Sequence, residues 1–529
     1  MNSELVELDL ISDYPTYWAA RCPEREAMVL GDIRWRYADL ARNVDLYARA
    51  LWAHGVRHGD RIAVLATPRP ESLCLFLAAA RIGALFTGLN LRFQYEELRY
   101  VVADSRPRLL IFLPAFRNRD YRDDIRRLLD EGLGIELAFS FGNACSGLSR
   151  PFSDFLARES AVPDADFAAA IAAVKRHDPC LLIYTSGSTG RPKGAMLPHF
   201  GLSHCSRNQL DHWWAEPLRV LNNLPISNVF CVGDLFCFCM VGGGTTVFME
   251  RFEAKEILTV IEREKVTLWG QVSTMLQLAL AQPEAETADL SSLQMIFWAG
   301  ARAPRELIQR LAKITPYLGS NYGLTETVAG VTYTEKGASL DVLADTVGKP
   351  DPHYEVRVVR PDGTPAADGE AGEIHIRGHC MMVGYWNRPE ATAAAIDKDG
   401  WLHSGDIGLR RPDGNFQIVG RMSDMFKSGG FNVYPREIEM MLETHPAVAM
   451  AAVIGVPDDL FGEVGHAYLL LRTDDQPSGE PAESDVANWC RERLANYKVP
   501  KRFHLRRKLP MLPVGKIDKV ALRKEAGLQ

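Results

Sequence analysis

The sequence lacks an excess of positive charge. Its 60 lysines and arginines are outnumbered by 67 aspartates and glutamates, which gives a formal net charge of -7. Proteins that bind nucleic acid or an anionic membrane surface usually carry a basic face or a polybasic segment. The charge balance therefore argues against a nucleic-acid partner and favours a small molecule.

The chain also lacks a long apolar run and an export signal. The longest uncharged apolar stretch, Leu235 to Met249, contains consecutive glycines and falls short of the roughly 20 residues that a helix needs to cross a bilayer. The amino-terminal string MNSELVELDLISDYP has acidic residues where a signal peptide has basic ones. We expect buried core at 235–249, no membrane span and a cytoplasmic protein.

Cysteine is present without the spacing of a metal site. The closest set, Cys231, Cys237 and Cys239, has no neighbouring histidine or second cysteine pair that would complete a zinc site. We expect the ten cysteines to be mostly buried free thiols in a reducing compartment.

Helical and strand patterns alternate in the first part of the chain. With 529 residues, 47% of them hydrophobic, the protein is long enough for at least two packed units. Apolar residues recur at helical spacing over 37–51, a buried strand is indicated at 61–66, a helix at 71–82 and a second strand at 109–113. This alternation predicts parallel strands covered by helices. We expect 150–166 to be a linker that leads into the next unit.

The pattern changes after residue 350. Short alternating strands at 354–359 and 372–377, separated by turn-rich strings, predict a small β-barrel-like unit. From residue 421 a further helix, strand and helix predict a compact domain. We therefore predict an α/β fold with a large N-terminal domain of layered α/β subdomains plus the small β unit, residues 1–420, and a small α+β C-terminal domain, residues 421–529.

The strongest local signal is the string YTSGSTGRPKG at 184–194. Its glycines free backbone N–H groups to surround phosphate oxygens, its hydroxyls add donors, and Lys193 adds a positive charge. Gly194 follows the lysine where a Walker A loop needs Ser or Thr, so an ordinary P-loop NTPase is disfavoured. A Gly-Ser-Thr-Gly string alone is more often a flexible turn, but the whole string favours a polyphosphate site.

The string NYGLTE at 321–326 combines three kinds of side chain within one turn. Tyr322 offers an aromatic platform for a purine, Thr325 a hydroxyl for a phosphate, and Glu326 a hard oxygen ligand of the kind that Mg²⁺ prefers. By itself such a string is more often the start of a helix.

Three further strings lie toward the C-terminus. Asp406 follows a glycine in GWLHSGD, where its carboxylate can take two ribose hydroxyls or form a simple turn. The string at 420–435 combines cations with a glycine pair and also fits a domain linker. Lys516 ends the tight turn PVGK, although most lysines near a terminus are only solvated.

All five strings occur in the order and approximate spacing of the adenylate-forming superfamily, which contains acyl-CoA synthetases, luciferases and peptide-synthetase adenylation domains. The chain resembles this superfamily from about residue 15 to its end, and most closely an acyl-CoA synthetase. Five motifs in order are far more specific than any one of them. The resemblance implies ATP, Mg²⁺ and coenzyme A, and a mobile C-terminal domain that rotates between two half-reactions.

The resemblance also assigns residues to roles. The loop that holds the β- and γ-phosphates matches Thr185, Ser186, Gly187, Ser188, Thr189, Gly190 and Lys193. The segment along adenine matches Gly300, Ala301 and Arg302, with Asn321 and Tyr322 at the edge and face of the base. Thr325 matches a phosphate contact, Glu326 the magnesium carboxylate, and Asp406 with Arg421 the ribose pair. Lys516 matches the lysine that reaches the substrate carboxylate and the α-phosphate, and Gly430 borders the pantetheine tunnel.

These residue types suit the chemistry. A carboxylate that attacks the α-phosphorus brings two anions together, so cations and positioning lower the barrier. No general base is needed because the acid is already ionised at neutral pH. In the second step a thiol attacks the acyl-adenylate and AMP leaves.

Two positions depart from the family pattern. The hinge position, usually Asp or Lys, is Ser423 here, and Asp424 beside it could serve instead. Asn228 stands where many acyl-CoA synthetases have His and amino-acid-activating relatives have Asp, so a free amino acid has no counter-charge for its ammonium group. Asp234, further along, is expected to face elsewhere.

Aromatic residues near Asn228 indicate an apolar acyl pocket, to which we assign Phe230 and Trp298. Trp298 stands near a position that the family often fills with a smaller residue, which indicates a short or compact acid. Most of the other aromatic residues in this region are expected to be plain core.

We therefore predict an ATP-dependent carboxylic acid:CoA ligase of fatty or aromatic acid metabolism, which forms an acyl-adenylate and releases AMP and pyrophosphate. One alternative is a standalone adenylation enzyme that loads a separate carrier protein or forms an amide. Another is a non-catalytic nucleotide-binding relative, against which Lys516 and Glu326 both argue. The sequence does not define the acid, and it leaves a homodimer open.

Overall fold

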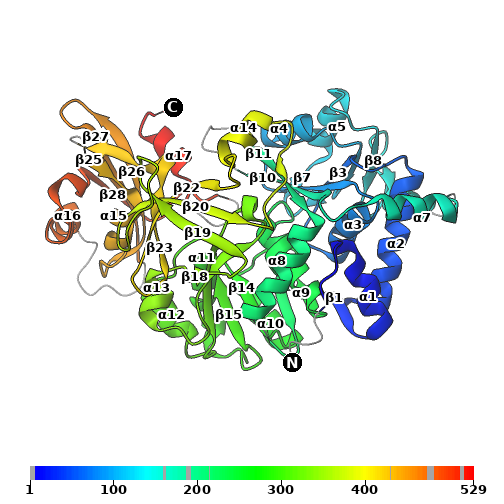
Figure 1. Ribbon diagram of the computed structural model, residues 1–529, viewed down its shortest axis with the longest axis horizontal. Coiled ribbons are helices and arrows are strands. Elements are labelled where there is room, and N and C mark those ends of the chain that lie inside the picture. Colours follow the sequence, from blue (N-terminus) through cyan, green and yellow to red (C-terminus); the bar gives the residue numbers. More distant parts are fainter. Residues whose placement is uncertain are drawn as a thin grey trace.

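The computed structural model describes residues 6–158, 162–185, 192–213, 215–428, 431–472, 482–512 and 517–528. Across these residues two large sheets and their helices form the bulk of the molecule (Figure 1). The nine-stranded sheet has the order β18 (Lys349–Pro350), β17 (Gly330–Tyr333), β16 (Leu318–Gly323), β15 (Met295–Trp298), β14 (Leu268–Gln271), β12 (Arg219–Asn222), β13 (Thr245–Phe248), β1 (Glu26–Leu30), β2 (Ile33–Arg36). The eight-stranded sheet has the order β21 (Gly384–Tyr385), β11 (Lys193–Pro198), β10 (Pro179–Thr185), β4 (Leu85–Leu89), β3 (Arg61–Leu65), β5 (Leu109–Phe112), β8 (Leu137–Ser140), β9 (Arg150–Pro151).

Helices and one small hairpin complete this part of the chain. The helices are α1 (Tyr14–Arg21), α2 (Tyr37–Ala53), α3 (Pro70–Arg81), α4 (Tyr95–Ser105), α5 (Arg122–Asp130), α6 (Phe152–Leu156), α7 (Asp164–Ala173), α8 (His199–His212), α9 (Phe238–Val241), α10 (Glu256–Glu264), α11 (Ser273–Leu280), α12 (Arg305–Leu311), α13 (Leu340–Asp345) and α14 (Pro389–Ala395). The hairpin pairs β6 (Ala115–Phe116) with β7 (Arg119–Asp120).

The core is layered because successive side chains of a strand point to opposite faces of its sheet. In β3, Ile62 and Val64 belong to the largest core cluster, whereas Ala63 and Leu65 belong to a cluster that includes residues of α4 and α5. The largest cluster also contains side chains of α3, α8 and the nine-stranded sheet. It therefore joins the two large sheets.

The elements predicted for the first 115 residues are confirmed. The helical spacing at 37–51 belongs to α2, in which every residue of that apolar pattern is buried. The strand expected at 61–66 is β3, and the helix expected at 71–82 is α3. Strands β4, β3, β5 and β8 pair in parallel, as layered α/β structure requires.

The stretch 150–166 is not a linker to a separate unit. It contains β9, α6 and the start of α7. Strand β10, which follows, pairs in parallel with β4, so the chain returns to the sheet that it has just left. The strand and helix at 150–156 are too short to show a clear period in the sequence.

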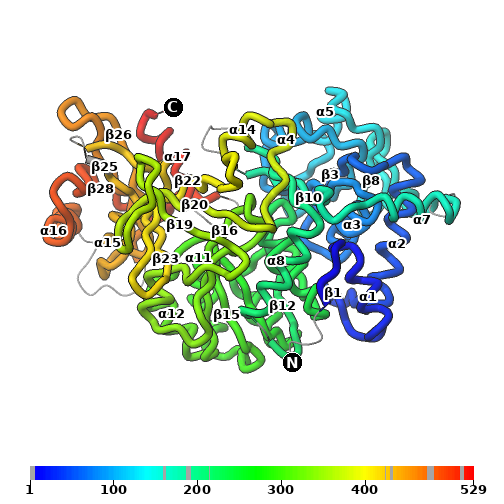
Figure 2. The backbone as a smooth tube through the Cα atoms, viewed as in Figure 1, coloured from blue at the N-terminus to red at the C-terminus, as the bar shows by residue number. Residues whose placement is uncertain are grey.

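Two smaller sheets follow residue 350: the first is antiparallel, and the second is mixed because its strands β27 and β28 pair in parallel. The predicted small β unit is a sheet of the order β19 (Tyr354–Val359), β20 (Gly372–Gly378), β22 (Leu402–Arg410), β23 (Phe416–Arg421). The second sheet contains β25 (Phe431–Val433), β24 (Phe426–Ser428), β27 (Gly462–Leu471), β26 (Val448–Asp458) and β28 (Arg502–Arg506). Its helices are α15 (Pro435–Leu442), α16 (Glu483–Arg491) and α17 (Lys519–Glu525). Figure 2 shows β19, β20, β22 and β23, green to yellow, between this C-terminal sheet and the large layered part.

The apolar stretch 235–249 is buried throughout, as predicted. It spans the end of the π-helix η4 (Phe230–Cys237), then α9 and β13. Among the helices that the structure describes, none is long and apolar enough to cross a membrane. All ten cysteines are free, and all but Cys22 and Cys145 are buried.

One carboxyl group is buried within this apolar layer. Asp234, in η4, is 7% exposed, and its Oδ1 atom has no hydrogen-bond partner within the described part of the chain. Burial raises the pKa of Asp234 from 3.8 to about 7, although a hydrogen bond from the backbone of Gly330 acts in the opposite direction. The neutral acid is therefore the form that the fold favours.

Asp234→Asn tests this buried acid. Between about pH 4 and pH 7 the folded protein retains a proton that the unfolded chain releases, so the free energy of unfolding falls as the pH rises through that window. The asparagine carries no charge, so the variant avoids this loss. We expect its free energy of unfolding to exceed that of the parent at about pH 8, by an upper limit on the order of 4 kcal/mol. At about pH 4 the two proteins should be nearly equal in stability. Thermal unfolding followed by circular dichroism at both pH values measures the difference. The exposed Asp459→Asn should shift the melting temperature equally at both, and the same behaviour in Asp234→Asn would contradict the assignment.

Candidate functional site

The two ends of the glycine-rich string belong to the paired strands of a β-hairpin. Strands β10 and β11 pair antiparallel, with Thr185 opposite Lys193 at the end of the ladder. The hairpin therefore presents both residues at its tip. The positions Ser186, Gly187, Ser188, Thr189 and Gly190 lie outside the described residues, so their assignment to phosphate stays a prediction.

The string 321–326 runs from the end of β16 into the 3-10 turn η6 (Thr325–Thr327). Gly323 is needed at the bend because an added Cβ atom would lie 2.2 Å from the carbonyl oxygen of Ala329. The hydroxyl of Thr327 accepts a hydrogen bond from the N–H of Leu324 at 2.9 Å and lies 2.8 Å from the oxygen of Ala329. These contacts hold Thr325 and Glu326 in one short, fixed turn.

Glu326 is the centre of a first polar group. Its Oε1 atom accepts hydrogen bonds from the hydroxyl of Tyr385 at 2.7 Å and from Oγ1 of Thr185 at 3.4 Å. Lys193 Nζ lies 5.0 Å from the centre of the Tyr385 ring. Burial and the charge of Glu326 raise the pKa of Tyr385, so its hydroxyl remains a donor. One carboxylate, two hydroxyls and an ammonium group are a suitable set for Mg²⁺ and phosphate oxygens.

Asp406 is the centre of a second polar group. Tyr322 donates a hydrogen bond to its Oδ2 atom at 2.8 Å, and Arg421 Nε lies 3.1 Å from its Oδ1 atom. Asp406 and Arg421 are directly opposite each other on β22 and β23. The Asp406 side chain is 6% exposed and that of Arg421 is 51% exposed. The structure thus brings together three of the residues that the family resemblance assigned to the nucleoside.

Asn321 and the segment 300–302 complete the nucleoside end. The Oδ1 atom of Asn321 is buried without a hydrogen-bond partner among the described residues, so it can accept a hydrogen bond from a purine amino group. Gly300 and Ala301 are exposed and leave their backbone open to a ligand. The guanidinium group of Arg302 instead contacts the carbonyl of Ala344 and the carboxylate of Asp345. The side chain of Arg302 is therefore not available for the predicted contact with adenine.

The structure brings together only part of the predicted acyl pocket. Asn228 Oδ1 accepts a hydrogen bond from the N–H of Phe230 at 3.0 Å and so caps the start of η4. The Phe230 ring lies 5.9 Å from that of Phe297, which stacks on Trp213 at 4.0 Å. Trp298 follows Phe297 on β15 and points to the opposite face, where it is completely buried in another core cluster. The structure therefore corrects the placement of Trp298: it is core, and it does not lie beside Phe230.

The C-terminal site residues are only partly described. Lys516 and Gly430 lie outside the described residues, and their roles stay predictions. The turn Met422–Asp424 (η7) joins β23 to β24. Asp424 pairs with two cations of α17, Lys519 at 3.5 Å and Arg523 at 3.9 Å.

Two residues that hold Glu326 or its turn in place were not predicted from the sequence. Tyr385 reaches Glu326 because β21 pairs antiparallel with β11, a contact between positions far apart in the chain. Thr327 directly follows the motif but resembles any other threonine until its hydroxyl is seen in the turn. The only local signal for Tyr385 was the preceding Gly384, which by itself indicates no more than a bend.

Two family models match this chain. The model of the AMP-binding enzyme family matches residues 16–386, and that of the AMP-binding enzyme C-terminal domain matches residues 437–516. The first match contains the hairpin tip, Asn321 and Glu326, whereas Asp406 and Arg421 lie between the two matches.

Similarity to individual proteins extends over nearly the whole chain. A feruloyl-CoA synthase from Amycolatopsis sp is 36% identical over 518 residues, which cover 98% of this chain and 99% of the relative. A medium/long-chain-fatty-acid–CoA ligase from Mycobacterium tuberculosis is 31% identical over 509 residues and covers 95% of this chain and 88% of the relative. The solved structure of the anthranilate CoA ligase AuaEII in complex with anthranoyl-AMP superposes with a TM-score of 0.87 at 26% identity, covering 100% of this chain and 99% of that one.

Tyr385→Phe tests the first polar group. The change removes only the hydroxyl that holds Glu326. We expect the dissociation constant for ATP in the presence of Mg²⁺ to rise about 10-fold, because a residue that binds a metal usually binds it more weakly when its supporting hydrogen bond is lost. Isothermal titration calorimetry measures the change, and binding of ATP in EDTA should be unaffected. Tyr317→Phe, at an exposed tyrosine, is the matched control. Equal losses with and without Mg²⁺ would show that Tyr385 acts on something other than the metal carboxylate.

Proposed function

The chain belongs to the AMP-binding enzyme family, and we propose that it joins an aromatic carboxylic acid to coenzyme A with cleavage of ATP to AMP and pyrophosphate. That it is an acid–thiol ligase follows from relatives named as CoA ligases along nearly its whole length. The observation that carries the proposal is the single segment 321–326. It contributes Tyr322 to the Asp406 group and Glu326 to the group at the hairpin tip.

This arrangement can align ATP along one segment. Asn321 and Tyr322 would meet the base, Asp406 with Arg421 the ribose hydroxyls, and Thr325 a phosphate. Mg²⁺, when bound, would neutralise charge on the phosphate oxygens, and Glu326 is the carboxylate that would hold it. Asp406 is already fixed by two partners, so little ordering is needed when the nucleotide arrives.

The proposed reaction has two displacement steps. In the first, an oxygen of the acid bonds to the α-phosphorus, the α–β phosphoanhydride bond breaks, and pyrophosphate leaves. Lys516 would neutralise the negative charge that gathers there. In the second, the sulfur of CoA bonds to the acyl carbon, the bond to AMP breaks, and the thiol proton passes to solvent. The carboxylic acid is already ionised at neutral pH, so the first step needs no protein base.

We propose that the boundary between the two domains, which the sequence predicted between residues 420 and 421, lies at the turn η7 directly after Arg421. β23 ends at Arg421 in the four-stranded sheet, and β24 begins the other sheet at Phe426. The two sheets therefore meet at the short turn η7. A rotation there would carry the C-terminal sheet, and with it Lys516, toward or away from Asp406.

An aromatic acid is favoured by the residues near Asn228. Phe230 packs near Phe297, which stacks on Trp213, and aromatic rings attract one another in offset and edge-to-face contacts. Asn228 carries no charge and would leave the ammonium group of a free amino acid without a partner. The names of two similar proteins, a feruloyl-CoA synthase and an anthranilate CoA ligase, agree with this choice.

The substrate class can be tested by direct competition. The protein is incubated with ATP, Mg²⁺, CoA and an equimolar mixture of ferulate, benzoate, decanoate and phenylalanine, and the thioesters are identified by mass spectrometry. We expect aryl-CoA products to predominate. In the Phe230→Leu variant, kcat/KM for the preferred aromatic acid should fall about 5-fold because an aromatic contact is lost. Decanoyl-CoA as the main product would refute the aromatic preference. ATP–pyrophosphate exchange without any thioester would instead support a carrier-loading or amide-forming enzyme.

Lys516→Ala and Gly430→Leu should separate the two steps. Lys516→Ala removes the cation at the α-phosphate, and we expect ATP–pyrophosphate exchange to fall by at least about 100-fold while thioester formation from supplied acyl-adenylate persists. Gly430→Leu adds bulk to the proposed pantetheine tunnel and should do the reverse. Equal loss of both steps in Lys516→Ala would refute its role, and normal CoA turnover in Gly430→Leu would show that the tunnel lies elsewhere.

A further inference from the structure

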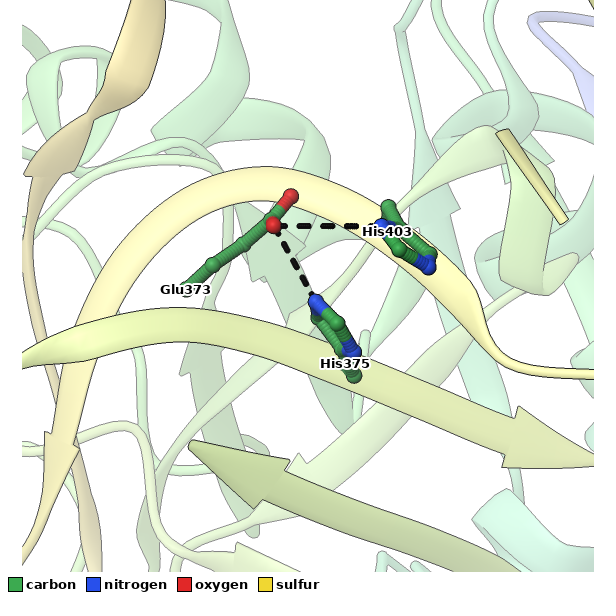
Figure 3. Close-up of side chains that lie close together, drawn as sticks. All are labelled: Glu373, His375 and His403. Atoms are coloured by element: carbon green, nitrogen blue, oxygen red, sulfur yellow. Dashed lines mark hydrogen bonds and ion pairs between the residues drawn. The ribbon is translucent and has the colours of Figure 1, made fainter. Parts of the chain in front are cut away.

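Three possible metal ligands meet on the four-stranded sheet, apart from the proposed Mg²⁺ carboxylate Glu326. Glu373 and His375 stand two residues apart on β20 and therefore share a face, and His403 on β22 is the cross-strand partner of His375. Figure 3 shows both rings beside the same Glu373 carboxylate. Its Oε2 atom lies 3.0 Å from His375 Nε2 and 3.9 Å from His403 Nδ1.

Two of the three atoms that point away from this group are held by other residues. Glu373 Oε1 accepts a hydrogen bond from the N–H of Gly405 at 3.0 Å. His403 Nε2 lies 3.4 Å from a carboxylate oxygen of Asp397. A histidine that binds a metal through one ring nitrogen usually donates the N–H of the other nitrogen to a carboxylate, and Asp397 is placed to accept from His403 Nε2. His375 Nδ1 is buried without a partner in the described part of the chain, so no second hydrogen bond fixes the tautomer of that ring.

We propose that Glu373, His375 and His403 bind one divalent transition-metal ion of the zinc class, with water completing the coordination. Two imidazoles and one carboxylate suit Zn²⁺ and its neighbours, whereas Mg²⁺ prefers oxygen ligands alone. Tetrahedral coordination with bonds near 2.0–2.1 Å separates ligand atoms by about 3.4 Å. The observed separations of 3.0 and 3.9 Å lie on either side of that value, and all three ligand atoms lie within 4.8 Å of one another.

The site is open on one side. The side chain of His403 is 39% exposed, whereas those of Glu373 and His375 are 18% and 7% exposed. An ion can therefore enter from solvent and keep a water ligand while two ligands hold it from within. Bound there, the ion would join β20 to β22, the strand that continues to Asp406. This proposal does not rest on the proposed function.

Zinc titration of the full-length protein tests the site. Protein stripped with EDTA and returned to a buffer that contains Mg²⁺ is titrated with Zn²⁺ by calorimetry, and bound zinc is counted by inductively coupled plasma mass spectrometry. We expect the parent to bind one equivalent more than either His375→Gln or His403→Gln, or these variants to bind that equivalent at least about 10-fold more weakly. The melting temperature of the parent should rise with Zn²⁺, and that of the variants should not, because a ligand that binds only the folded state stabilises it.

His504→Gln is the matched control. His504 lies 5.5 Å from His466, ring centre to ring centre, on the C-terminal sheet, and its replacement should leave the zinc count unchanged. Circular dichroism verifies that each variant is folded, and Glu373→Gln provides a third variant should a histidine variant fail to fold. Equal zinc counts and affinities in the parent and in the folded variants would overturn the proposal, as would a parent that binds no zinc.

Discussion

The proposed nucleotide site depends on the pairing of the buried carboxylate of Asp406. A charge removed from water destabilises a fold unless close partners surround it, and Asp406 is only 4% exposed. Its partners, Tyr322 and Arg421, come from two different sheets. The pairing therefore fixes the four-stranded sheet against the nine-stranded one. Because Glu326 follows Tyr322 on the same segment, this contact also sets the position of the phosphate end of the site.

Much of this architecture could be predicted from the sequence, because the relevant signals are local. The helical period of α2 and the apolar run of β3 depend only on neighbouring residues, and both elements were located within a few positions. The turn that carries Thr325 and Glu326 was located from its own string, since its glycine and hydroxyls act on their own backbone. The pairing of Asp406 with Arg421 came from the family resemblance, and β22 and β23 bring the two residues together as expected.

The remaining features depend on contacts that no local pattern encodes. Tyr385 reaches Glu326 only because β21 joins the edge of β11, and edge pairing leaves no period in the sequence. Trp298 was assigned to the pocket from a position in the family pattern, but the alternation of β15 sends it to the opposite face from Phe297. The stretch 150–166 looked like a linker because its strand and helix are short. In each case the tertiary environment, and not the residue type, decides the outcome.

The ion pairs on either side of η7 have a mechanical consequence. Arg421 is attached to Asp406 of the four-stranded sheet, and Asp424 is attached through Lys519 to α17, where Lys519 also contacts Glu439 of α15 at 2.7 Å. The two ends of η7 are thus attached to different parts of the molecule, one to the four-stranded sheet and the other to helix α17. A rotation that preserves both attachments must be absorbed by the backbone torsions of the two residues between them, Met422 and Ser423. In the proposed rotation of the C-terminal domain, the ion pairs of Arg421 and Asp424 on either side of η7 would therefore set the limits of the movement.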